Sequence, residues 1–91
     1  MILTGKTKED FIKTKIGNEI NLFESMLPIY KNALLIDFFD SVGIYINIRR
    51  TNNEFMSYIT NDESSFYKKI RQEALSEAIK KANEIYNKKI K

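Results

Sequence analysis

The chain has 91 residues and a formal net charge of +3, and it contains no histidine, cysteine or tryptophan. A chain of this length is expected to form a single domain, residues 1–91. Because histidine and cysteine are missing, the sequence excludes a Ser-His-Asp triad, a Cys-His pair, a disulfide and a zinc site built on imidazole or thiolate. We therefore expect a binding module without catalytic residues, cofactor or metal, and not an enzyme.

The composition also bears on location and charge. No apolar run approaches the ~20 residues of a membrane span, and the first ten residues lack a secretory layout, so we expect a cytoplasmic protein of a bacterial cell. Residues 66–91 carry eight basic and three acidic side chains, whereas residues 1–65 are net acidic. A basic terminal helix can meet phosphate or an acidic protein patch, or it can simply face solvent.

The first third of the chain reads as two short helices. Thr7 supplies a capping hydroxyl ahead of Glu9 and Asp10, and apolar residues then follow at helical spacing. Gly17 interrupts this pattern: either it ends one helix and Asn18 caps the next, or one longer helix tolerates the glycine, and we favour a break or kink.

A third helix is expected from Pro28, which suits a first helical turn, to Asp40. Its apolar residues cover a wide arc, so this helix should be central to the fold. The apolar residues in question are Tyr30, Ala33, Leu34, Leu35, Phe38 and Phe39.

The apolar period then changes from 3.6 to 2, which predicts a hairpin of strands 44–49 and 54–60 around a turn at Asn52 and Asn53. Counting back from the turn sets the register. One face is then aliphatic and the other amphipathic. The predicted pairs are Arg50 with Phe55, Ile48 with Ser57 and Ile46 with Ile59.

The last element is predicted as a long helix over residues 66–87, with Ala74, Ala78 and Ala82 allowing close approach to a sheet or another helix. Polar, cap-forming residues 61–65 precede it. The expected fold is α+β: helices packed on a two-stranded antiparallel β-hairpin, with a long C-terminal helix. The hairpin needs a helical layer on its aliphatic face.

The amphipathic face of the hairpin is the best candidate site. Tyrosine, arginine and methionine are enriched where proteins touch one another, and tyrosines beside arginine can also stack on unpaired bases. A covering helix would instead make these residues part of the core. Asp37 and Asp40 could hold a divalent ion but are better read as structural or solvated carboxylates. We expect partner binding by Tyr45, Asn47, Arg49, Arg50, Asn53, Met56 and Tyr58, supported by Lys80 and Lys88 of the last helix.

Two segments carry a resemblance. The run 37–44, which leads into the hairpin, and the run 77–87 of the last helix are similar to small proteins of phages and prophages in AT-rich bacteria. On this basis the chain resembles an anti-CRISPR protein, and a type VI RNA-guided ribonuclease is the target that this resemblance implies. The implied partner is a bacterial CRISPR effector nuclease, with or without its guide RNA. The alternatives are a nucleic-acid-binding phage regulator and a self-associating antitoxin-like module, so the chain is expected to be a monomer or a homodimer.

Overall fold

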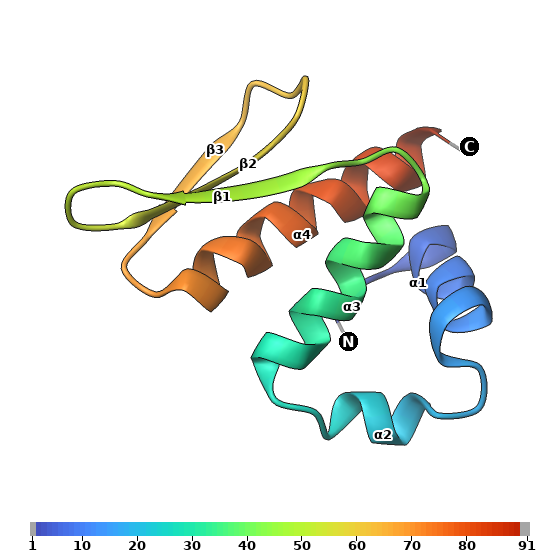
Figure 1. The fold of residues 1–91 in the computed structure, drawn as a ribbon. Helices are drawn as coiled ribbons and strands as arrows, with labels where there is room; N and C mark the ends of the chain where they lie inside the picture. Colours follow the sequence, from blue (N-terminus) through green and yellow to red (C-terminus); the bar gives the residue numbers. More distant parts are fainter. Residues whose placement is uncertain (1, 90–91) are drawn as a thin grey trace.

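A computed structural model describes residues 2–89 as an α+β fold in which the helices lie on one side of a three-stranded antiparallel sheet (Figure 1). No helix in the described part of the chain is both long and apolar enough to cross a membrane. The elements in chain order are α1 (Gly5–Phe11), its π-helical continuation η1 (Ile12–Ile16), α2 (Ile20–Glu24), α3 (Pro28–Ser41), β1 (Ile46–Arg50), β2 (Phe55–Ile59), β3 (Ser65–Lys68) and α4 (Arg71–Lys89).

The hairpin of β1 and β2 has the predicted register. Ile46 pairs with Ile59, and Ile48 pairs with Ser57. The turn is closed by Thr51, whose amide donates to the Glu54 carbonyl at 2.8 Å. Because residues on one face of a strand alternate with residues on the other, this register also confirms the division into an aliphatic and an amphipathic face.

The third strand corrects the prediction of a two-stranded sheet. β3 runs antiparallel to β2 as the second edge strand, so that Ser57 pairs with Phe66 and Met56 with Tyr67. Residues 66–70 were therefore wrongly assigned to the last helix, which begins at Arg71. The error arose because Tyr67 and Ile70 also continue the helical spacing of the residues that follow.

The N-terminal region breaks where the sequence indicates. Gly17 follows η1 with φ +60°, a conformation that favours glycine, and its amide donates to the Ile12 carbonyl at 2.6 Å. The two predicted caps are wrong. α2 has Glu19 rather than Asn18 at its N-cap. Thr7 lies inside α1, fully buried against α4.

The core forms where α1 and α3 pack on α4, and α2 adds Phe23 to it. The rings of Phe11 and Phe23 meet edge to face with centroids 5.2 Å apart, and Phe11 also packs against Phe38 at 5.6 Å. Such pairs add about 0.5–1.5 kcal/mol each to the burial of their area. The predicted close approach of the last helix is confirmed, because Ala74, Ala78 and Ala82 of α4 are all fully buried.

α3 is central along one side only. It buries Leu35, Phe38 and Phe39, as predicted. Its opposite side remains in solvent, and Ile29 and Tyr30 are 54% and 60% exposed. The predicted central position therefore applies to one side of α3, since no element of the described chain covers the side that carries Ile29 and Tyr30.

Candidate functional site

The amphipathic side of the sheet forms an open surface, which we call the outer face. Register places its side chains in rows across the three strands, since directly paired residues point to the same side. The row nearest the hairpin tip is Arg49, Met56 and Tyr67, the next is Asn47, Tyr58 and Ser65, and the last is Tyr45 beside Thr60.

No helix among residues 2–89 covers the outer face. Both α3 and α4 lie on the other side of the sheet, as Figure 1 shows. The Cα atoms span only 17 Å along the shortest axis, which accommodates a sheet and one helical layer. Tyr45 and Tyr67 are 52% and 53% exposed. The possibility that these tyrosines belong to a covered core is thereby removed.

The covered side holds the sheet in place. The hydroxyl of Ser57, fully buried, donates to the Ala74 carbonyl of α4 at 2.5 Å. Ile59 is buried on the same side, and Phe66 is half-buried. Since strand residues alternate between faces, burial of these side chains fixes the opposite set toward solvent.

At its base, the outer face is ordered by a side-chain bond. The amide of Asn47 donates to Thr60 Oγ1 at 2.8 Å and approaches the Tyr45 carbonyl at 3.3 Å. This contact crosses from β1 to the end of β2 beside Tyr45. The side chain of Asn47 therefore stabilises the sheet, and the tyrosines are the side chains of this face that are more available for contact with a partner.

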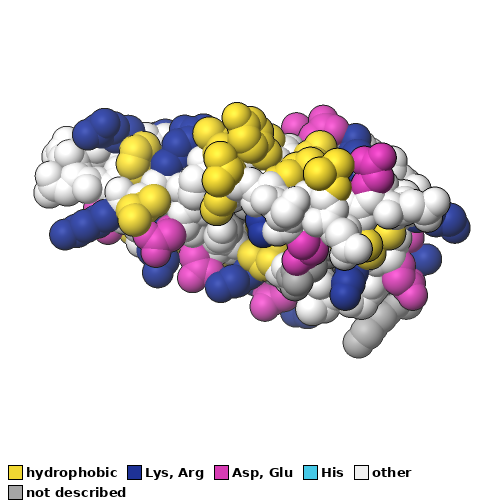
Figure 2. All heavy atoms as spheres, turned by 90° about the horizontal axis from the view of Figure 1, so that it is seen from below, with side chains coloured by type: hydrophobic (Ala, Val, Ile, Leu, Met, Phe, Trp, Pro, Cys, Tyr) yellow, Lys and Arg dark blue, Asp and Glu magenta, His cyan; other side chains and the backbone are white. Residues whose placement is uncertain are grey.

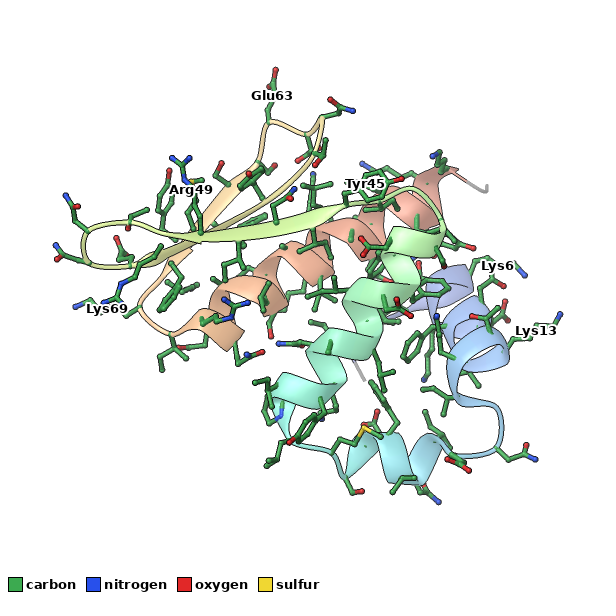
Figure 3. All side chains as sticks on the ribbon, in the orientation of Figure 1. Lys6, Lys13, Tyr45, Arg49, Glu63 and Lys69 are labelled. Carbon is green, nitrogen blue, oxygen red and sulfur yellow. The ribbon has the colours of Figure 1, made fainter. Side chains whose placement is uncertain are left out.

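The charge on the outer face is low. Arg49 is the charged member of the strand rows, and it points away from the helices (Figure 3). Glu63 stands on the loop between β2 and β3, and Lys69 lies beyond the end of β3 (Figure 3). An aromatic surface with one arginine among its strand residues suits a protein partner better than a phosphate backbone.

The structure separates the other predicted residues from the outer face. Arg50 points to the helical side at the tip, with its guanidinium carbon 5.7 Å from the centroid of the Phe55 ring. Asn53 is exposed in the turn itself. Lys80 and Lys88 lie on α4, where Lys80 pairs with Glu77 at 3.3 Å. These lysines therefore do not form one surface with the hairpin tyrosines.

Tyr67 is the member of the outer face that sequence reasoning missed. Once β3 pairs with β2, Tyr67 stands directly opposite Met56. Ser65-Phe66-Tyr67-Lys68 does alternate between polar and aromatic residues, but four residues are a weak strand signal beside a long helical pattern.

Residues 2–89 contain no cluster of three or more acidic side chains that could hold a metal ion. Asp37, considered above as a ligand, accepts a hydrogen bond from Lys15 Nζ at 2.5 Å. Asp40 is exposed at the end of α3. The described carboxylates thus offer no carboxylate-only magnesium site.

Comparison of the chain with protein-family models, with curated proteins and with solved structures found no significant match.

Proposed function

We propose that this chain is a non-enzymatic inhibitor of the anti-CRISPR kind, which binds a bacterial RNA-guided defence nuclease through its outer face and blocks its activity. The observation that supports this proposal is the uncovered outer face, with three tyrosines, Met56 and Arg49 on a three-stranded sheet. Tyrosine and arginine are the residues that most often dominate binding energy at protein interfaces.

The chemistry of the chain supports inhibition by contact. Histidine and cysteine are absent, so the usual general base and the usual thiol nucleophile are absent too. A small protein that acts by occupying a surface needs neither of them. The nuclease as partner rests on the resemblance of the segments 37–44 and 77–87 to small phage proteins.

The test uses tagged chain in a bacterial host that carries an active RNA-guided nuclease. We expect the nuclease to be recovered with the chain and interference against a targeted plasmid to fall on co-expression. Arg49→Glu should weaken both effects, since a charged hot-spot residue is worth about 2 kcal/mol or more. Arg71→Glu makes the same charge change at an exposed position on the helical side and should leave both effects intact.

A second candidate function is binding of single-stranded nucleic acid, and the observation that favours it is the presence of Tyr45, Tyr58 and Tyr67 on one sheet face. Bases stack on such tyrosines with about 1–3 kcal/mol per base. A gel shift with single-stranded RNA or DNA that weakens steeply with salt, and that needs Tyr58 and Tyr67, would favour this function over nuclease binding.

A further inference from the structure

A second unpartnered surface lies on the helical layer, at the corner between α2 and α3. We call it the α3 patch. Figure 2, which views the molecule from below, shows hydrophobic side chains gathered in the middle of this face. The large members are more than half exposed: Leu22 at 55%, Leu27 at 63%, Ile29 at 54% and Tyr30 at 60%. Ala33, one turn after Ile29, is exposed as well.

The patch is continuous. Leu27, Ile29 and Tyr30 are near neighbours at the start of α3, and Leu34 lies one turn beyond Tyr30. Leu34 and Leu22 line the same small hollow between α2 and α3. The four large side chains together present on the order of 500 Å² of apolar surface, taking ~150–250 Å² for a fully exposed large side chain. That is toward the upper end of the ~300–600 Å² typical of the largest patch on a monomer.

The charges of α3 run opposite to the preference of an isolated helix. Its first turn carries no acidic residue and its last turn no basic one, while Asp37, which pairs with Lys15, and Asp40 lie toward its carboxyl end. Carboxylates are unfavourable near the negative end of a helix dipole and favourable near the positive amino end. A neighbouring helix that ran antiparallel to α3 would bring these carboxylates toward its own amino end.

We infer from the self-complementary pattern of apolar surface and charge that the occupant of the α3 patch is a second copy of this chain. In a two-fold dimer the two α3 helices pack antiparallel, with the small Ala33 near the axis and Ile29 and Tyr30 around it. A two-fold interface uses the same patch on both subunits. Each copy then places Asp37 and Asp40 near the amino end of the partner's α3. A standard interface takes ~800 Å² from each partner, so the apolar patch supplies more than half and its polar border the rest.

This dimer is independent of the proposed function. The α3 patch is on the helical layer, and the outer face is on the opposite side of the sheet (Figure 1). Dimerisation would therefore leave both outer faces free and give the assembly two equivalent binding surfaces.

Sedimentation equilibrium over a range of protein concentrations tests the inference. The wild-type chain should show a monomer–dimer equilibrium, and Ala33→Arg should be monomeric, since it places a charge at the centre of the interface. Tyr30→Ala provides a second variant and should weaken association about tenfold or more. Ser65→Arg makes the same charge change at an exposed position of the outer face and should leave the dimer unchanged.

Wild-type chain that stays monomeric up to about 1 mM, where even an association with a dissociation constant of that size would be visible, overturns the inference. A dimer that survives both Ala33→Arg and Tyr30→Ala overturns it too, because the interface would then lie elsewhere. Nuclease binding measured on Arg49→Glu and on Ala33→Arg separates the two proposals. If nuclease binding is lost in Arg49→Glu but kept in Ala33→Arg, the outer face binds the nuclease and the α3 patch forms the dimer.

Discussion

Asp10 and Tyr86 join α1 to α4 through a short hydrogen bond. The Tyr86 hydroxyl donates to Asp10 Oδ2 at 2.5 Å, and Lys6 Nζ lies 3.2 Å from Asp10 Oδ1. The bond from Tyr86 lowers the pKa of Asp10 from its ordinary value of 3.8, and Lys6 adds to this effect. The same bond raises the pKa of Tyr86 from 10.0 to about 12. Both shifts favour the pair of carboxylate and protonated phenol.

The pair predicts how stability depends on pH. Because the folded pKa of Tyr86 is raised, its contribution is complete below pH 10 and is lost as pH rises from 10 to about 12. Because the pKa of Asp10 is lowered in the folded state, its contribution to stability is complete above pH 3.8. That contribution is lost as the pH falls through the lowered pKa of the folded state. The difference in unfolding free energy between wild type and Tyr86→Phe should therefore be largest between these limits. Urea titrations at several pH values measure it, and a difference that stays constant from pH 8 to 12 would contradict the assignment.

At the scale of elements, the sequence predicted those features that local chemistry determines. The turn at Asn52 and Asn53 and the period of two set the β1–β2 register, and Pro28 marked the start of α3. β3 was missed because a strand of four residues forms only through its pairing with an adjacent strand, here β2. Ser65–Lys68 gains its hydrogen bonds only when β2 is already present, whereas the helical spacing of Tyr67, Ile70 and Ala74 is visible in the sequence itself.

The candidate site was likewise predicted correctly only in those features that local chemistry determines. Alternation along one hairpin correctly grouped Tyr45, Asn47, Arg49, Met56 and Tyr58 on one face. Whether that face is covered depends on where the helices pack, and sequence spacing does not contain this information. Lys80 and Lys88 were grouped with the hairpin because of their charge alone. The charge of a residue does not indicate which surface of the fold it lies on.

The contact between α4 and the sheet depends on small side chains, and Ser57 tests this dependence. Its buried hydroxyl bonds to the Ala74 carbonyl, so Ser57→Ala should cost about 0.5–1.5 kcal/mol of unfolding free energy. Ser57→Val adds bulk where no space exists and should cost more, about 1–3 kcal/mol. Ser65→Val, on the exposed outer face of β3, should change stability by less than about 0.5 kcal/mol. Urea midpoints with an unchanged m-value measure all three, and equal costs for the two valine variants would show that the helix–sheet contact is loose.

At the scale of the whole molecule, a partly buried polar cluster joins the start of the described chain to the end of α4. Asn83 Oδ1 accepts from the Thr4 amide at 3.0 Å, and its Nδ2 donates to Thr4 Oγ1 at 3.0 Å. Asn87 Oδ1 accepts from the amide and the hydroxyl of Thr7 at 3.0 and 2.8 Å. Gly5 lies against this cluster, since a Cβ there would stand 3.1 Å from Asn87 Oδ1. Partners this far apart in sequence explain why Thr7 was mistaken for a helix cap.

Removal of Asn87 should loosen the attachment of α1 to the rest of the fold. Asn87→Ala takes one acceptor from two donors of the fully buried Thr7, so we expect a loss of about 1–3 kcal/mol in unfolding free energy. The amides of α1 should then exchange hydrogen faster than those of β2, because α1 reaches the core mainly through Phe11 and this cluster. Asn53→Ala, at the exposed hairpin tip, is the matched control and should be nearly neutral.

Thr7→Val, alone and combined with Asn87→Ala, shows whether the two residues act as one unit. Since both substitutions remove the same hydroxyl–amide bond, the double variant should lose less stability than the sum of the two single losses, with a coupling of about 0.5–3 kcal/mol. Full additivity would mean that Thr7 is held by the Asn83 carbonyl, 3.2 Å from its hydroxyl, and that Asn87 contributes separately. Coupling together with faster exchange in α1 would establish that the polar cluster, and not the aromatic core alone, fixes the amino-terminal helix against α4.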